Sequence, residues 1–276
     1  MALFGGMVLS FDIPLIKLAQ GDVWSVMALR GSSVAIAALL IYGVARLLKL
    51  EGFRPNFSPA ALAATGAYML SSVTFLSAVF LTSTANVAFI LAFAGMFAAL
   101  LGWLMLGEKP PLATFATLIV TAFGVALIVG GGLTTGNWLG DVLALTTAFA
   151  LALAITVTRK HDVDMRLNVL MSNAVPALIV GAFLANGDGL SIAAPHWVFL
   201  NGFVVIPVSF LFLAYAPRLL YGPVVAMAYL LETIFAPIWV WMIFSESPTN
   251  MTLIGGSIML SAILAHGVWE LRQARR

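Results

Sequence analysis

The chain has 276 residues, of which 62% are hydrophobic and 9% are charged, and its mean hydropathy is +1.07. Soluble domains carry about 25% charged residues and about 45–50% apolar ones, so the charges here are too few to cover a water-exposed surface. The composition therefore predicts a protein whose main solvent is lipid. Because the chain contains no cysteine, disulfides and thiolate metal sites are excluded.

Long apolar runs follow one another along the whole sequence. One bilayer crossing needs about 20 mostly apolar residues, and roughly ten such runs joined by short loops use up the chain. In chain order, the predicted helices cover residues 3–19, 23–49, 59–81, 84–106, 112–131, 138–159, 167–186, 196–216, 221–244 and 251–270. Glycine, proline and asparagine mark the breaks between them. We expect an all-α membrane protein with ten transmembrane helices, with no soluble catalytic or receptor domain and no cleavable signal peptide.

Basic residues indicate how the helices are oriented, because loop lysines and arginines stay on the cytoplasmic side. Apart from Lys17 and Arg30, every Lys and Arg lies in an even-numbered connection or in the C-terminal tail, and the odd-numbered connections contain none. Both termini are therefore predicted to be cytoplasmic, in a multi-pass protein of the cell inner membrane. This topology also explains the net charge of +2 without a nucleic-acid partner.

The first two predicted helices carry charges at membrane depth. Asp12 and Arg30 each lie seven residues in from the outer end of their helix, so an antiparallel hairpin brings them to one depth, where they can pair. A buried pair that fixes the hairpin and a role in substrate binding both stay open. Pro14 is expected to kink the first helix and to make it a mobile element. Lys17 lies nearer the outer surface, where its side chain can snorkel. Asp12, Pro14, Lys17 and Arg30 are our candidates for coupling or gating.

An internal repeat relates the two halves of the chain. Residues 85–110 align without gaps on residues 223–248. Identical pairs include Val87/Val225, Ala88/Ala226, Phe97/Phe235, Ala98/Ala236, Trp103/Trp241, Glu108/Glu246 and Pro110/Pro248. These segments are the fourth and ninth predicted helices, and an odd number of helices per repeat inverts the second copy in the membrane. We therefore expect two inverted five-helix repeats, at residues 1–134 and 135–276, with the substrate site near the midplane between them.

At these residues the chain resembles the EamA-type members of the drug/metabolite transporter superfamily. Leu106–Lys109 is similar to the Leu-Gly-Glu-Arg/Lys ending of the family's fourth helix, and Leu231–Glu232 resembles its Leu-Glu-Pro element, with Thr233 replacing the proline. Lys17 falls where the family's first helix usually has a lysine, whereas Asp12 stands where asparagine is common. The resemblance implies alternating access around a central cavity. It also implies export of amino acids, aromatic ones among them, or of other metabolites or toxic cations.

Deep polar residues of the third, fourth and ninth predicted helices are candidate substrate ligands. Glu232 lies near the middle of its helix, where it can bind a substrate ammonium group or take up a coupling proton. Tyr229 precedes it by three residues and shares its face. Tyr68 is a second deep phenol, and Asn86 is a polar group near the outer end of its helix. A cavity lined by Tyr68, Tyr229 and Glu232 suits a small zwitterion with an apolar side chain, and Asn86 is a further candidate ligand. Ordinary helix–helix hydrogen bonding is the competing interpretation.

Two further sequence features have structural interpretations. All seven tryptophans fall near predicted helix ends, which is typical of the interfacial belt rather than of ligands. Gly130–Gly132 is not followed by the Gly-Lys-Ser/Thr of a phosphate loop, and we interpret it as a flexible joint between the two halves.

The sequence favours a secondary transporter of amino acids over four alternatives. A carrier of phosphorylated solutes needs several deep basic residues, and here only Arg30 and Lys17 qualify; a carrier of cationic solutes is a further possibility in the same superfamily. A membrane receptor or scaffold has no positive support. An enzyme needs a clustered nucleophile and base or metal ligands, whereas the three histidines are scattered. The expected partners are a small-molecule substrate, membrane lipid and protons, without a cofactor or metal.

Overall fold

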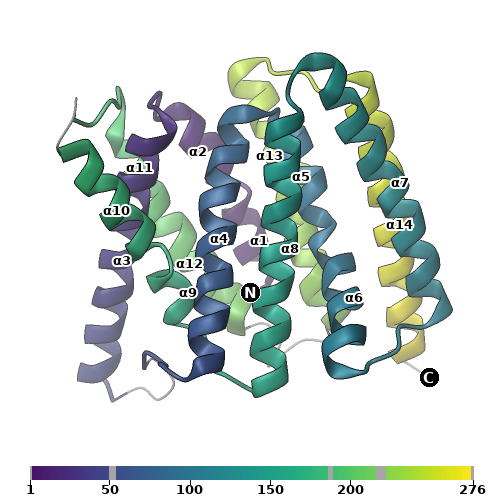
Figure 1. The fold of residues 1–276 in the computed structure, drawn as a ribbon, viewed down its shortest axis with the longest axis horizontal. Helices are drawn as coiled ribbons and strands as arrows, with labels where there is room; N and C mark the ends of the chain where they lie inside the picture. Colours follow the sequence, from purple (N-terminus) through teal and green to yellow (C-terminus); the bar gives the residue numbers. More distant parts are fainter. Residues whose placement is uncertain (1, 50–53, 186–188, 216–221, 275–276) are drawn as a thin grey trace.

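Long α-helices lie side by side in the computed structural model, which describes residues 2–49, 54–185, 189–215 and 222–274 (Figure 1). In these ranges there is no β-strand, and the β contact present is an isolated antiparallel bridge between Gly21 and Ile192. The expectation of an all-α protein is therefore confirmed.

The helices follow the predicted segments closely. In chain order they are α1 (Ala2–Leu9), α2 (Asp12–Leu18), α3 (Val23–Leu47), α4 (Pro59–Leu81), α5 (Thr84–Ala92), α6 (Ala94–Leu106), α7 (Leu112–Thr135), α8 (Trp138–His161), α9 (Asn168–Met171), α10 (Ala174–Ala185), α11 (Pro195–Leu200), the π-helix η1 (Asn201–Val205), α12 (Ile206–Tyr215), α13 (Gly222–Phe244) and α14 (Asn250–Ala274). Four predicted segments are divided: the first into α1 and α2, the fourth into α5 and α6, the seventh into α9 and α10, and the eighth into α11, η1 and α12.

Capping residues explain why several helices begin where they do. The Ser58 side chain accepts a hydrogen bond from the Ala61 backbone N–H at the start of α4, and Pro59 occupies the first turn, where its missing N–H costs nothing. Asp22 caps α3 by accepting from the backbone N–H groups of Trp24 and Ser25. Partial burial alone would raise the pKa of Asp22, but the hydrogen bonds from Ser25 and Trp24 together outweigh it and lower the pKa below its ordinary value.

The Gly130–Gly132 run is helical, which corrects its interpretation as a flexible joint. It lies inside α7, which continues to Thr135. A Cβ on Gly132 would lie 2.0 Å from Oδ2 of Asp141 in α8, and one on Gly131 would lie 2.9 Å from Cβ of Met251 in α14. Glycine is therefore needed here so that α8 and α14 can approach the end of α7 closely.

The helices indicate a membrane-embedded protein. Of the described residues, seven helical stretches are long and apolar enough to cross a membrane: Val23–Leu47, Pro59–Leu81, Thr84–Leu106, Leu112–Leu133, Trp138–His161, Pro195–Leu213 and Asn250–Gln273. Asn168–Leu184 and Leu231–Phe244 are shorter apolar stretches. Many large apolar side chains, such as those of Leu47, Leu112 and Phe183, point outward. Such a surface suits lipid rather than water.

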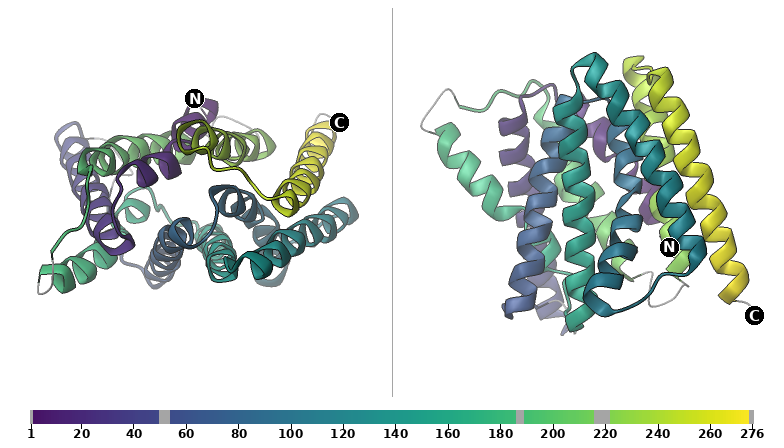
Figure 2. Two further views of the ribbon diagram at one scale, coloured as in Figure 1. Left: turned by 90° about the horizontal axis from the view of Figure 1, so that it is seen from above. Right: turned by 45° about the vertical axis from the view of Figure 1, so that its right-hand side comes forward.

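Helix packing connects segments that are far apart in the sequence. At one side of the bundle α7 packs along α14, and at the other α3 packs against α10 (Figures 1 and 2). Between these pairs, α4 lies along α8, and α5 contacts α13. The pieces α5 and α6 also pack on α8, while α13 packs on α1 and α2. The largest apolar core cluster joins these middle helices and includes Ile13, Leu76, Ile90 and Ile128.

Candidate functional site

The first predicted helix is broken at Ser10–Phe11, between α1 and α2. Pro14 causes the break, because it has no N–H to donate and its ring clashes with the carbonyl four residues earlier, which is that of Ser10. The interruption leaves Asp12 at the start of α2, and the Ser10 hydroxyl donates to the Met7 carbonyl at 2.7 Å. The indole Nε1 of Trp239 in α13 donates a hydrogen bond of 3.0 Å to that hydroxyl.

A buried charged network forms at this break. Nη2 of Arg30 in α3 donates to both carboxylate oxygens of Asp12, at 3.0 and 3.3 Å. Asp12 is 4% exposed and Arg30 6% exposed, and the guanidinium lies 5.9 Å from the ring centre of Phe75 in α4. The ion pair between Asp12 and Arg30, which their equal depth in the membrane predicted, is therefore present. Removing one partner of a buried ion pair leaves the other charge uncompensated, so the two residues depend on each other.

Asn201 completes the network, and the sequence did not single it out. Its Oδ1 accepts from Nε of Arg30 at 2.9 Å, and its Nδ2 donates to Oδ1 of Asp12 at 2.7 Å and to the Asp12 carbonyl at 3.2 Å. Asn201 is fully buried and opens the π-helix η1, a distortion often found at functional sites. A lone amide in an otherwise apolar helix is the signal that could have revealed it.

Glu232 of α13 lies beside this network. It is partly buried and near enough to Asp12 and Arg30 for their charges to act on its carboxyl group, without a hydrogen bond or ion pair to either. Further along α13, the rings of Phe235 and Trp239 stack with centroids 5.8 Å apart. Trp239 also stacks on Phe11, at 5.2 Å and 14° between planes. An aromatic surface therefore adjoins the charged groups. Trp239 was expected only in the interfacial belt, so its contact with Phe11 was not predicted. The side chain of Tyr229 lies outside the described part of the chain.

Asn86 belongs to a second polar cluster, built by α4, α5, α8 and α14. Its Nδ2 donates to Oδ1 of Asp141 at 2.9 Å, and its Oδ1 accepts from the Thr252 hydroxyl at 2.6 Å. The Thr82 hydroxyl donates to the same Asp141 oxygen at 2.6 Å. Asp141 is fully buried. This cluster ties four helices together near one end of the bundle.

The remaining two candidates lie elsewhere. Tyr68 packs against the small cluster of Ala61, Ala64 and Met165. Lys17 forms an ion pair with Glu246, which follows α13. Of the sequence-based candidates, the structure thus brings together Asp12, Arg30 and Glu232, with Pro14 shaping the helix break. The other three candidates make their contacts away from the charged network; they are Asn86, Tyr68 and Lys17.

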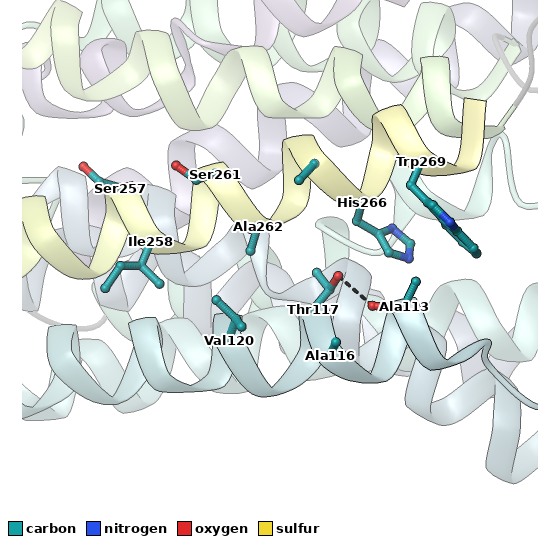
Figure 3. Close-up of a pocket in the computed structure, with 11 residues that line it drawn as sticks. Ala113, Ala116, Thr117, Val120, Ser257, Ile258, Ser261, Ala262, His266 and Trp269 are labelled. Atoms are coloured by element: carbon teal, nitrogen blue, oxygen red, sulfur yellow. Dashed lines mark hydrogen bonds between the residues drawn. The ribbon is translucent and has the colours of Figure 1, made fainter. Parts of the chain in front are cut away.

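An open groove of about 780 Å³ lies between α7 and α14 (Figure 3). Its walls are mostly alanine and serine, and none of the sequence-based site candidates lines it. His266 on this wall pairs through Nε2 with the Thr114 hydroxyl at 2.8 Å, which links the two helices. The charged network and this groove are separate features of the structure.

Comparisons with known proteins bear on the fold. No protein-family model and no curated protein matches this chain. A solved structure described only as "Crystal structure of protein" is similar over 97% of this chain and 96% of its own, with a TM-score of 0.69 and 13% sequence identity. At that identity the likeness concerns the fold alone.

Proposed function

We propose that this chain is a secondary transporter of the EamA type, which moves small metabolites, namely amino acids and aromatic ones among them, across the inner membrane by alternating access and works as an exporter. The observation that carries the proposal is the buried Asp12–Arg30–Asn201 network with Glu232 beside it, inside a membrane-embedded helical bundle. Ionisable groups at membrane depth are costly and usually mark substrate or ion pathways. The broken helix at Ser10–Phe11 adds support, because transporter sites are often formed by discontinuous helices.

We further infer that ten helical segments form two inverted repeats of five. In that arrangement, each helix has a counterpart in the other half. A contact between two helices should therefore recur between their two counterparts. The contact of α4 with α8 corresponds to that of α12 with α1, and the contact of α5 with α8 corresponds to that of α13 with α1. The pairs α3–α10, α5–α13 and α7–α14 map onto themselves. This correspondence supports a substrate site between the halves, where the charged network lies.

The chemistry of the site favours a zwitterion. Glu232 can address the ammonium group of a zwitterion, and the stacked rings of Phe11 and Trp239 suit its apolar or aromatic side chain. A phosphorylated solute would need free deep cations. In the described part of the chain, Arg30 is already bonded to Asp12, and Lys17 to Glu246. Amino acids are therefore the preferred substrate class.

Counterflow in proteoliposomes tests this function. Vesicles loaded with unlabelled aromatic or aliphatic amino acids should take up the labelled ones, and Glu232→Gln should lower that exchange at least tenfold. Asp162→Asn, at an exposed position after α8, is the matched control and should behave like the parent. Absence of exchange for every amino acid would reject the substrate class, and specific binding without any exchange would favour a receptor.

A further inference from the structure

Two ion pairs join the two halves of the chain at opposite ends of the bundle. Glu246 follows α13 in the second half and pairs with Lys17 of α2 in the first half. Glu108 follows α6 in the first half and pairs with Arg159 of α8 in the second half, with Nη2 donating to both carboxylate oxygens at 3.0 Å. In Figure 1, α2 and the α13–α14 connection lie at the top, and the ends of α6 and α8 lie at the bottom.

The internal repeat relates these pairs to each other. Glu108 and Glu246 are aligned positions, each two residues after the end of its helix. Their partners lie at similar places in the two halves. Lys17 is the penultimate residue of α2, which ends the first predicted segment. Arg159 lies two residues before the end of α8, which is the sixth predicted segment. Each half thus contributes one carboxylate to one end and one cation to the other.

The two pairs differ in their surroundings. The Lys17 and Glu246 side chains are 21% and 27% exposed, whereas those of Arg159 and Glu108 are both 52% exposed. Glu246 has a further bond, because its Oε1 accepts from the backbone N–H of Thr84 at 2.7 Å. Since Thr84 is the first residue of α5, the carboxylate also complements the positive end of that helix. The Lys17–Glu246 pair therefore closes its end of the bundle more firmly.

We propose that Lys17–Glu246 and Arg159–Glu108 are the two gates of the carrier, and that one pair breaks only while the other holds. This inference rests on the proposed transport function. A carrier with one central site must open one end at a time, and a rocking motion of one half against the other separates contacts at one end while preserving them at the other. Both pairs span the halves, so each resists opening at its own end. Each carboxylate and cation acts by positioning helices and does not touch the substrate.

A single reporter at the central site tests the proposal without any substrate. Ser10 is fully buried at the helix break between the two pairs, and the natural chain has no cysteine, so Ser10→Cys provides one thiol. Its reaction with a membrane-impermeant maleimide would be followed in right-side-out and inside-out vesicles. Lys17→Gln should raise the labelling rate from the Lys17 side about fivefold or more and lower it from the other side. Arg159→Gln should do the reverse, by about two- to fivefold, since its pair is exposed.

Charge reversal and a matched control complete the experiment. Lys17→Glu should act as Lys17→Gln does, and combining it with Glu246→Lys should restore the parent rate in part, because the reversed pair lacks the bond from the Thr84 N–H. Arg166→Gln breaks an ion pair with Asp164 that lies within one connection, so labelling should not change. If the two variants change the labelling rate in opposite directions but the parent exchanges no amino acid, the gate proposal is supported and the substrate class is rejected. Labelling that rises from the same side in both variants, or that does not change in either, would overturn the proposal.

Discussion

Replacing Asn201 by leucine tests the charged network most directly, because it removes the amide at nearly constant volume. Three hydrogen bonds are lost, to Arg30 Nε, Asp12 Oδ1 and the Asp12 carbonyl. Hydrogen bonds between membrane helices average about 0.6 kcal/mol, which sets a lower bound of about 2 kcal/mol for the three. Bonds to charged groups reach about 1.5–3 kcal/mol each, and two of these partners are charged. We expect Asn201→Leu to lower the free energy of unfolding by about 2–6 kcal/mol.

The assay is a titration with a denaturing detergent, followed through the fluorescence of the seven tryptophans. Ser209→Ala is the matched control: Ser209 is fully buried nearby on α12, and its hydroxyl has no partner in the described part of the chain, so its loss should cost nothing. In an Asp12→Asn, Arg30→Gln background, where both charges are gone, Asn201→Leu should cost about 1 kcal/mol or less. An equal cost in both backgrounds would refute the view that the amide serves the ion pair.

Three further perturbations follow from other contacts. Gly132→Ala should lower the free energy of unfolding by about 1–3 kcal/mol, because the added Cβ would lie 2.0 Å from a carboxylate oxygen of Asp141. Gly130→Ala is the control: its Cβ would enter open space, so this variant should be neutral or stabilising in the same titration. The pKa of Asp22 is lowered in the folded state, so its contribution to stability is fully present above about pH 4 and is lost as pH falls through the folded-state pKa. The stability advantage of the parent over Asp22→Asn should therefore shrink as pH falls below about 4, and a pH-independent difference would contradict this. Pro14→Ala restores a donor for the Ser10 carbonyl, so it should stabilise the first helix and slow amino-acid counterflow; unchanged exchange would show that the helix break is not needed.

Local signals were sufficient to predict most of the helices. Pro59–Leu81 has the predicted bounds because Ser58 and Pro59 start the helix, and both are visible in the sequence. The pairing of Asp12 with Arg30 also followed from counting residues along a hairpin. The break at Ser10–Phe11 follows from Pro14, although its position was not predicted.

Contacts between distant residues could not be predicted from the sequence alone. Asn201 is 189 residues from Asp12, and Glu246 is 229 residues from Lys17, so no local pattern connects them. Lys17 was therefore interpreted as a snorkelling side chain. The Gly130–Gly132 run was taken for a joint because glycine weakens helices. Its actual reason, the close approach of Asp141 and Met251, depends on how α7 packs against α8 and α14.

The distribution of polar contacts supports the proposed division of the chain into two halves. In the described part of the chain, every hydrogen bond between side chains that are at least 51 residues apart in the sequence joins a residue of 1–134 to a residue of 135–276. Examples are the pairs Asp12–Asn201, Thr74–Thr147 and Asn86–Asp141. Lipid supplies no hydrophobic force between helices, so close packing and hydrogen bonds must hold them. Packing of small apolar residues varies little when helices shift slightly, whereas a hydrogen bond is either made or broken. The polar contacts between the halves can therefore select a small number of relative positions, which is what a carrier needs in order to expose its site to one side at a time.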